Sequence, residues 1–455
     1  MTQNRWILFA VLSISFFGPF MASSINIAIP AMGKEFDLLP QQLSWVVTAF
    51  LVGSAAFLVP FGKLADIVGS KRLFCIGLRF LLAATVACAL SPDAFMLILF
   101  RLLQGVSLAM IFSTSMAMLV ASHPPAQRGR VIGYSAAATY IGLSLGPVVG
   151  GLMTQFLGWR LIFWCMAGGI LLSLLAMGTV EGEWYGEPSD RLDYIGSLLY
   201  SLSAGLLLYG LSSYGEYPLA GAFLAAGVIF FILFLWEQYT AKYPLIDWQL
   251  FRSGIFAFSN LAAMIHYSST FALGFILSLY LQLLRGFDAA HAGLFLLLQP
   301  VMMAAFSPLA GSLSDKKQPR LVASSGMAMT ALGLAAFLLM DENSSLLLLG
   351  GNLLFIGVGF AFFSSPNSNA IMGAVSSREY GIAAAVLSVM RIGGQAVSMA
   401  IVTVILTTTT ASVPAAEYLP SLMQVFHRVF AVFAVLCSLG VFISLARGRR
   451  PIKSE

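Results

Sequence analysis

The connection that decides the fold reads, from residue 62 to residue 72, Gly-Lys-Leu-Ala-Asp-Ile-Val-Gly-Ser-Lys-Arg. It lies between two long apolar runs, residues 43–62 and 73–91. A run of about 18 or more apolar residues can cross the hydrocarbon core of a bilayer, about 30 Å thick, as a helix. The pattern therefore predicts two membrane-spanning helices joined by a short polar turn.

The same alternation continues in both directions along the chain. Of its 455 residues, 59% are hydrophobic and only 9% are charged, whereas an average soluble domain carries about 25% charged residues. We expect an all-α integral membrane protein with fourteen transmembrane helices, over residues 6–30, 43–62, 73–91, 95–121, 130–155, 160–180, 194–214, 219–239, 255–284, 290–312, 321–340, 345–374, 380–408 and 425–446. The first run is longer than the 7–15 residues of a signal-peptide core, so it is included as a span.

A second copy of the opening pattern occurs between the tenth and eleventh spans. Residues 311–317 read Gly-Ser-Leu-Ser-Asp-Lys-Lys, again a Gly, an Asp four residues later, and basic residues. If the copies are equivalent, spans 1–6 match spans 9–14, as in transporters built from repeated halves. The expected division is residues 1–182, a six-helix half; 183–254, a linker and two inserted helices; and 255–455, a second six-helix half with a basic tail.

The basic residues explain the formal net charge of +5. With both termini in the cytoplasm, the outer segments keep only Lys34, Arg160, Arg285 and Arg428, while seventeen Lys and Arg residues fall on the cytoplasmic side. This bias is the positive-inside rule, so we expect a multi-pass protein of the plasma membrane, with no nucleic-acid partner.

The sequence offers no sign of a metal site or cofactor. The four cysteines fall within or at the edge of predicted spans, without the spacing of a zinc site or a disulfide framework. There is also no Gly-x4-Gly-Lys-Ser/Thr loop to bind ATP.

The repeated connections predict a gating latch. The Asp66 carboxylate can accept charge-assisted hydrogen bonds from basic groups or from a helix N-terminus, and Gly62 would permit close helix approach. A solvated turn whose charges only set the topology is the alternative. The predicted latch residues are Gly62, Asp66, Gly69, Lys71, Arg72, Gly311 and Asp315.

The fourth span carries Arg101 and Gln104 one helical turn apart, on one face. An arginine near mid-membrane costs roughly 2.5–3.5 kcal/mol on insertion scales, so it should face the bundle interior or a watery cavity. Snorkelling to an interface is the alternative. The fifth span carries small residues at helical spacing and a proline, Gly142, Gly146, Pro147, Gly150 and Gly151, a pattern of close helix packing or of a hinge.

Taken together, these motifs resemble the major facilitator superfamily, and within it the fourteen-helix drug:proton antiporter branch. Weaker similarities continue through residues 26–30, 45–50, 158–160, 193–196, 244–251 and 280–286. The resemblance implies export of small amphipathic compounds by alternating access, coupled to protons. It also implies that Asp66, Lys71 and Arg72 form a conformational latch, that Arg101 belongs to the coupling or substrate network, and that Gly146 and Pro147 form an exchange hinge.

One position departs from that branch. An aspartate usually lies nine residues before the proline that corresponds to Pro30, and this chain has Met21 there. All 19 acidic residues lie in loops or at predicted span ends. This composition removes the usual proton carrier and the usual attraction for cationic drugs, so a narrow-specificity exporter of a neutral or anionic metabolite is the alternative function.

Other polar residues inside spans are candidates for a cavity. His266 has an ordinary pKa near 6.5 that suits a proton relay, although a hydrogen-bonded packing role is the alternative. Arg391 and Gln395 are one turn apart. The cavity candidates are Asn26, Asn260, Gln282, Gln299, Asn367, Asn369, Arg391 and Gln395.

Three rival functions are weighed against transport. Gly142 to Gly146 fits the Gly-x-Ser-x-Gly pattern of a serine hydrolase, but it lacks the strand-to-helix context of a nucleophile elbow. A channel would not need paired latches, and a transporter-like sensor would bind ligand without flux. We therefore expect a non-enzymatic, monomeric transporter whose partners are the lipid bilayer, a small-molecule substrate and a proton or other coupling ion.

Overall fold

The computed structural model describes residues 3–38, 40–185, 191–214, 218–245, 248–375, 380–410 and 418–448, and all regular secondary structure within these ranges is helical. Fourteen helices of this part of the chain are long and apolar enough to cross a membrane. Inside a bilayer, backbone groups must pair within the protein, and a helix satisfies them within one segment. The predicted all-α membrane fold with fourteen spans is confirmed.

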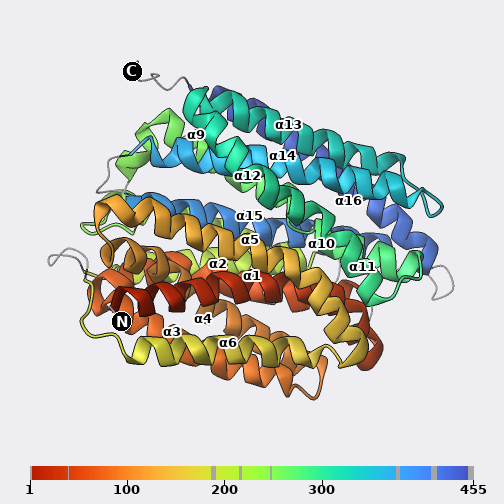
Figure 1. Ribbon diagram of the computed structural model, residues 1–455, viewed down its shortest axis with the longest axis horizontal. Helices are drawn as coiled ribbons and strands as arrows, with labels where there is room; N and C mark the ends of the chain where they lie inside the picture. Colours follow the sequence, from red (N-terminus) through yellow and green to blue (C-terminus); the bar gives the residue numbers. More distant parts are fainter. Residues whose placement is uncertain are drawn as a thin grey trace. The chain divides into compact units, whose positions relative to one another are not determined.

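The chain divides into two compact units, Met1–Ile246 (unit 1) and Asp247–Glu455 (unit 2). Both are shown as ribbons in Figure 1. The helices of unit 1 are α1 (Gln3–Phe36), α2 (Pro40–Val68), α3 (Ser70–Ala89), α4 (Ala94–Ala121), α5 (Pro125–Phe156), α6 (Arg160–Gly178), α7 (Tyr194–Ser212) and α8 (Ala220–Thr240).

Unit 2 begins with a short 3₁₀ turn, and its first span is interrupted near residue 271 and ends in a π-helical turn. Its elements are η1 (Trp248–Arg252), α9 (Gly254–Thr270), α10 (Leu273–Leu279), η2 (Tyr280–Leu284), α11 (Ala289–Leu296), α12 (Leu298–Lys316), α13 (Pro319–Ala336), η3 (Phe337–Leu339), α14 (Leu346–Met372), α15 (Tyr380–Thr410) and α16 (Tyr418–Ala446).

The two units repeat one packing pattern. In unit 1, α1 packs on α5 and α6, α2 on α4, and α3 on α4 and α6. In unit 2, α9 packs on α15 and α16, α12 on α14, and α13 on α14 and α16. Each of these helix contacts of unit 1 has a counterpart in unit 2 between the helices that lie eight spans further along the chain. The repeat expected from the two polar connections is therefore present in the packing of the helices.

The inserted pair α7 and α8 packs with unit 1. Tyr200 and Ser201 of α7 donate hydrogen bonds to the carbonyl oxygens of Ala55 and Ala56 in α2, at 3.0 and 2.8 Å. The outer helix of the pair, α8, leaves most of its apolar side chains exposed, as expected of a helix that faces lipid. The predicted three-part division, with residues 183–254 as a separate insertion, stays a prediction.

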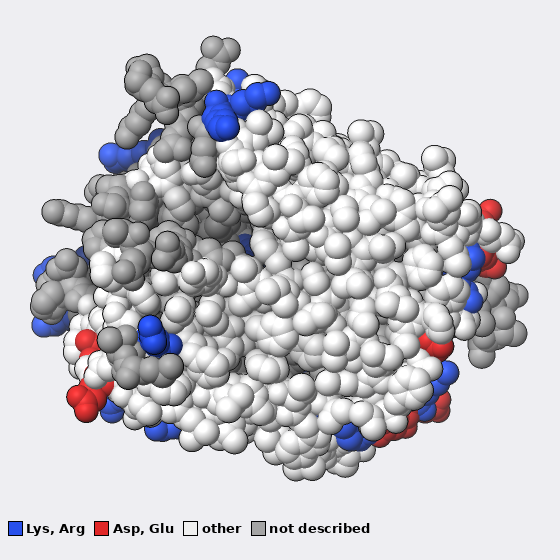
Figure 2. All heavy atoms as spheres, in the orientation of Figure 1, with Lys and Arg blue, Asp and Glu red and all other residues white. Residues whose placement is uncertain are grey.

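Short polar side chains mark where several helices begin. Asp93, Asp193, Ser253, Asp288 and Ser345 each accept a backbone N–H at the start of the helix that follows, which satisfies a donor that has no partner within the helix. On the face seen in Figure 2, most Lys, Arg, Asp and Glu side chains lie towards the two sides of the view, and the broad surface between them carries few. This distribution fits a protein surrounded by lipid.

Candidate functional site

The predicted polar pair of α4 is the centre of a buried cluster in unit 1. The Arg101 side chain is only 1% exposed. Its Nε donates to the Val46 carbonyl oxygen in α2 at 2.8 Å, and its Nη1 donates to Oε1 of Gln104 at 2.8 Å. The guanidinium also lies 4.4 Å from the centre of the Phe50 ring. Arg101 therefore faces the interior of unit 1 and does not snorkel to an interface.

Met21 of α1 completes this cluster. Its Sδ lies 3.9 Å from both Arg101 Nη1 and Gln104 Nε2, and Gln104 donates to Thr85 Oγ1 of α3 at 2.7 Å. Hydrogen bonds to a charged group stabilise a protein by roughly 1.5–3 kcal/mol each, enough to offset the cost of placing an arginine in the membrane. Within the described part of the chain, no carboxylate forms a salt bridge with Arg101. The cluster is thus a fixed positive charge with neutral neighbours.

The glycine stripe of α5 packs directly on α1. A Cβ added at Gly142 would overlap the Phe16 carbonyl oxygen, and one added at Gly150 would overlap Ser24. Ser24 Oγ donates to the Gly146 carbonyl oxygen at 2.9 Å, just before the buried Pro147. The stripe therefore serves close helix packing, and its role as an exchange hinge stays a prediction. Gly151 is also buried.

The connection between α2 and α3 is clamped by a residue that sequence reasoning missed. Glu183, which follows α6, accepts the backbone N–H groups of Lys71 and Arg72 at 2.7 and 2.9 Å. The Ser70 N–H donates to the Trp184 carbonyl oxygen at 2.8 Å. A carboxylate at a helix N-terminus is stabilised by the unpaired N–H groups and by the helix dipole.

Other predicted latch residues lie around Glu183. Gly69 has a φ of 103°, and a Cβ there would also overlap the Glu183 side chain, so the position requires glycine. The Lys71 ammonium donates to the Val180 carbonyl oxygen. Asp66 is half-buried near the end of α2, and its latch role stays a prediction. The close helix approach expected at Gly62 is wrong, because space around its Cβ position is open within the described residues.

The equivalent connection in unit 2, between α12 and α13, is held by neutral groups. Asn369 of α14 donates to Ser314 Oγ at 2.9 Å, and Ser314 Oγ donates to the Gly311 carbonyl oxygen at 2.7 Å. A Cβ on Gly311 would lie 3.0 Å from Ser365 Oγ. The side chain of Asp315 lies outside the described residues. Among the side chains that the structure describes, the contacts at this connection differ from those around Glu183 in unit 1.

Arg447, directly after α16, is the second fully buried arginine, and its place was not foreseen because it lies in a basic tail. It is 2% exposed, and its Nη1 donates to Asn367 Oδ1 of α14 at 2.9 Å. Its Nε donates to the Ser444 carbonyl oxygen at 2.8 Å, and its Nη2 donates to Ser444 Oγ. These contacts tie the end of α16 to α14.

His266 of α9 is fully buried among aromatic rings. Its ring stacks on Phe363 with centroids 4.0 Å apart and meets the edge of Phe360 at 4.8 Å. Neither ring nitrogen has a hydrogen-bond partner in the described part of the chain. The packing part of the expected alternative is thus present, whereas its hydrogen bonds are not found among the described residues, and the role as a proton relay stays a prediction. An unpaired buried polar group costs roughly 1–3 kcal/mol, so this position calls for a reason beyond packing.

The remaining cavity candidates belong to both units. In unit 1, Asn26 is half-buried in α1, and its Oδ1 has no partner among the described residues. In unit 2, Arg391 and Gln395 are half-buried on α15. Gln282 of η2 donates to Ser278 Oγ of α10 at 2.9 Å, sixteen residues and about 24 Å of helix from His266. Within unit 2, Gln282 and His266 therefore lie far apart.

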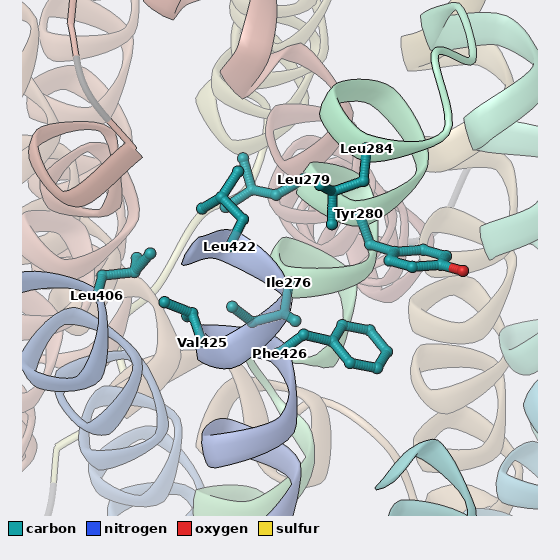
Figure 3. Close-up of a pocket in the computed structure, with 8 residues that line it drawn as sticks. All are labelled: Ile276, Leu279, Tyr280, Leu284, Leu406, Leu422, Val425 and Phe426. Atoms are coloured by element: carbon teal, nitrogen blue, oxygen red, sulfur yellow. The ribbon is translucent and has the colours of Figure 1, made fainter. Parts of the chain in front are cut away.

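A small apolar pocket lies in unit 2 around the junction of α10 and η2. It is lined by α10, η2, α15 and α16, through Ile276, Leu279, Tyr280, Leu284, Leu406, Leu422, Val425 and Phe426. Figure 3 shows these side chains converging, with the Tyr280 hydroxyl as the only polar group among them. No predicted cavity residue is among the lining residues described, and the Tyr280 hydroxyl already donates to the Asp341 carbonyl oxygen at 2.8 Å.

Comparisons with known proteins agree with these features. The model of the Major Facilitator Superfamily matches residues 11–257, 192–399 and 259–455. The chain is 29% identical over 391 residues to the riboflavin transporter RibZ of Clostridioides difficile, covering 86% of this chain and 85% of that one. It is 30% identical over 386 residues to the multidrug resistance protein Stp of Mycobacterium tuberculosis, covering 83% and 71%.

Solved structures share the fold at low identity. A bacterial homologue of the human lysosomal transporter Spinster, in an inward-facing and unoccupied conformation, superposes with a TM-score of 0.68 at 15% identity over 99% of both chains. A peptide transporter POT in complex with sulfate gives 0.68 at 15% identity, over 97% of this chain and 95% of that one. The chain belongs to the Major Facilitator Superfamily and is a multi-pass membrane transporter of small molecules, not an enzyme.

Proposed function

We propose that the protein exports small amphipathic compounds by alternating access, driven by a proton gradient. The observation that carries this proposal is the Arg101 cluster, a buried positive charge held by Val46, Gln104 and Phe50 without a carboxylate partner among the described residues. A charge placed so deep in a membrane protein is expensive and is typical of a substrate or ion pathway.

The charge of the cluster favours particular cargo. A cation near Arg101 would meet a like charge in a low-dielectric setting, whereas a neutral acceptor or an anion would be attracted. Met21, at van der Waals distance from the guanidinium, adds an apolar and adaptable surface. We therefore infer a preference for neutral or anionic amphipathic compounds over cationic ones.

The names of the relatives support export, but they are compatible with two classes of cargo, many unrelated drugs or one metabolite. Drug efflux is named for JefA of Mycobacterium tuberculosis, 29% identical over 380 residues, and multidrug resistance for Stp. A narrow-specificity exporter of a neutral or anionic metabolite is the second candidate, favoured by Met21 and by the relative named as a riboflavin transporter. The first class predicts many unrelated cargos and the second predicts one.

The remaining roles belong to the same proposal. The Glu183 clamp, with Gly69, Lys71 and Arg72, would hold one conformation of unit 1, and release of the clamp would accompany alternation. Asp66 and Asp315 would act in the latches, and the α5 stripe would act as hinge. We place the protein in the plasma membrane as a monomer with both termini in the cytoplasm.

The test is export from everted membrane vesicles with an imposed pH gradient. A panel of cationic, neutral and anionic fluorescent compounds is offered with and without a protonophore. We expect protonophore-sensitive transport of neutral and anionic compounds, its loss in Arg101→Ala, and its retention in Arg79→Ala, which removes an exposed arginine of neighbouring α3. Transport confined to cationic compounds, or unaffected by the protonophore, would contradict the proposal.

A further inference from the structure

The seam between α9 and α14 in unit 2 holds buried polar atoms that lack partners. Among the described residues, neither ring nitrogen of His266, nor Ser259 Oγ, nor Asn260 Oδ1 has a hydrogen-bond partner, and all three side chains are fully buried. Buried polar groups nearly always pair with protein or with ordered water. Three such groups on one helix therefore call for water or for a second arrangement of the seam.

The spacing places two of these groups, Ser259 and His266, along one line of the helix. Ser259 and His266 are seven residues apart, so they share a face of α9 and are separated by about 10.5 Å along its axis. Ala262 and Ala263 lie between them and are small and buried. Opposite, Phe363 of α14 stacks on His266, and Asn367, one turn further on, donates to the Ser259 carbonyl oxygen at 3.1 Å. Ordered water is the usual partner of buried polar atoms that the protein itself leaves unpaired.

Arg447 stands at one end of this line. It donates to Asn367 Oδ1 at 2.9 Å, so the same amide links it to Ser259. Arg447 also lines a second pocket, at the C-terminal end of α16, with Ile255, Gln318, Pro319, Arg320, Ala370 and Gly448. A guanidinium stays charged at neutral pH, and a fixed positive charge in a narrow passage opposes the entry of protons. Arg447 thus separates His266 from that pocket.

The surroundings of His266 contain no described acid. The elements packed on α9 are η1, α14, α15 and α16. Their titratable or charged groups with described side chains, together with those of α9, are Arg252, Tyr267, Arg391, His427, Arg428 and Cys437, with Arg447 after α16. A proton on the imidazole would therefore not be held by a fixed carboxylate, and it could leave again through water.

We propose that His266 is the proton-accepting site of the transporter, reached through water in the seam between α9 and α14, and that Arg447 is the gate of that route. The inference rests on the proton-driven export proposed above and names the group that would carry the proton. An imidazole suits this role because either ring nitrogen can bind or release a proton, and both nitrogens of His266 lack a partner among the described residues.

The gate is tested in liposomes that contain the purified full-length protein, without cargo. An internal pH-sensitive dye reports proton entry after an imposed pH gradient. We expect Arg447→Gln to raise proton entry several-fold over the unaltered protein, and the double variant His266→Gln/Arg447→Gln to return it to the basal rate. Lys317→Gln, which removes an exposed lysine near the start of α13, is the matched control and should leave the rate unchanged.

Each outcome decides a separate point. A leak that persists in the double variant shows that His266 is not the site. If folded Arg447→Gln, judged by monodisperse elution and melting temperature, shows no leak, Arg447 is not the gate. If that variant does not fold, Arg447→Met, which removes the charge but keeps a long side chain, is used, and a leak equal to the basal rate overturns the gate.

A second readout separates this inference from the proposed function. In the same liposomes, His266→Gln should abolish export driven by a pH gradient while cargo exchange at equal pH continues. Loss of both activities would mean a structural role for His266 and would overturn the inference. If the unaltered protein exports its cargo without any response to a pH gradient, the proposed proton coupling fails, whether or not the leak of Arg447→Gln depends on His266.

Discussion

Units 1 and 2 repeat the same helix packing, but each buries its one fully enclosed arginine, among the described residues, at a different depth. In unit 1, Arg101 lies within α4 and is held by α2 and by Gln104. In unit 2, Arg447 lies beyond the end of α16 and is held by Asn367 of α14. The span of unit 2 that corresponds to α1 carries instead His266, whose ring nitrogens have no hydrogen-bond partner among the described residues.

This difference shows how a repeated scaffold can divide its tasks. The packing between helices is set by small and apolar residues and is preserved, because each unit must bury a similar set of surfaces. The buried polar side chains are few, and they occupy different positions in the two units although the helices pack in the same way. We infer that unit 1 carries the fixed charge that selects cargo, while unit 2 carries the group that can change charge.

The largest effect on this contrast between the units is expected from a carboxylate placed beside Arg101 in unit 1. Met21 touches both Arg101 and Gln104, so Met21→Asp would form an ion pair that cancels the buried positive charge. A charge-assisted hydrogen bond of about 1.5–3 kcal/mol corresponds to roughly a tenfold to hundredfold change in affinity. We therefore expect the initial rates of export of neutral and anionic compounds in everted vesicles to fall by at least about tenfold, in line with this loss of affinity.

The control for this change is Met21→Leu, which keeps the volume and adds no charge. It should retain export close to that of the unaltered protein. If Met21→Asp leaves the preference among anionic, neutral and cationic compounds unchanged, Arg101 does not select the cargo, and the assignment of fixed charge to unit 1 is wrong.

A smaller effect is expected from a change at the connection between α2 and α3, whose contacts differ from those of the equivalent connection between α12 and α13. In unit 1, Glu183 binds the first N–H groups of α3, whereas neutral Asn369 and Ser314 act in unit 2. Glu183→Gln removes the charge at a helix N-terminus and should lower stability by about 1–2 kcal/mol. Hydrogen–deuterium exchange should quicken at Lys71 and Arg72 and stay unchanged at the start of α13.

Glu181→Gln is the matched control, because this exposed carboxylate lies two residues away. It should leave the exchange of both segments unchanged. Equal protection of Lys71 and Arg72 in Glu183→Gln and in the unaltered protein would mean that the clamp adds no stability in the membrane.

The sequence predicts those features of the fold and of the site that depend on residues close together in the chain. Fourteen spans follow from apolar runs that can be counted, and Arg101 and Gln104 share a face because they are three residues apart. Glu183 and Arg447 escaped prediction because their partners lie 112 and 80 residues away. One lies in a polar linker and the other in a basic tail, where a charge is the ordinary expectation. His266 was found, but its aromatic enclosure depends on packing that no local pattern encodes.

The smallest effect should come from the end of unit 1 opposite the Glu183 clamp. Glu35 at the end of α1 accepts from Arg160 at 2.6 Å and from Trp159 Nε1 at 2.7 Å. The two charged side chains are 35% and 41% exposed, so solvent screens the pair, and exposed pairs contribute about 0–1 kcal/mol.

We therefore expect Glu35→Gln to lower stability by less than about 1 kcal/mol and to leave export unchanged. Arg160 keeps its bond to the Ser91 carbonyl oxygen at 3.1 Å, and its guanidinium still lies 4.3 Å from the Trp159 ring centre. Thermal unfolding in detergent at low and high salt gives the measurement. A loss of stability well above about 1 kcal/mol in Glu35→Gln would mean that the Glu35–Arg160 pair stabilises unit 1 as strongly as the Glu183 clamp does. The two ends of unit 1 would then not differ in this respect.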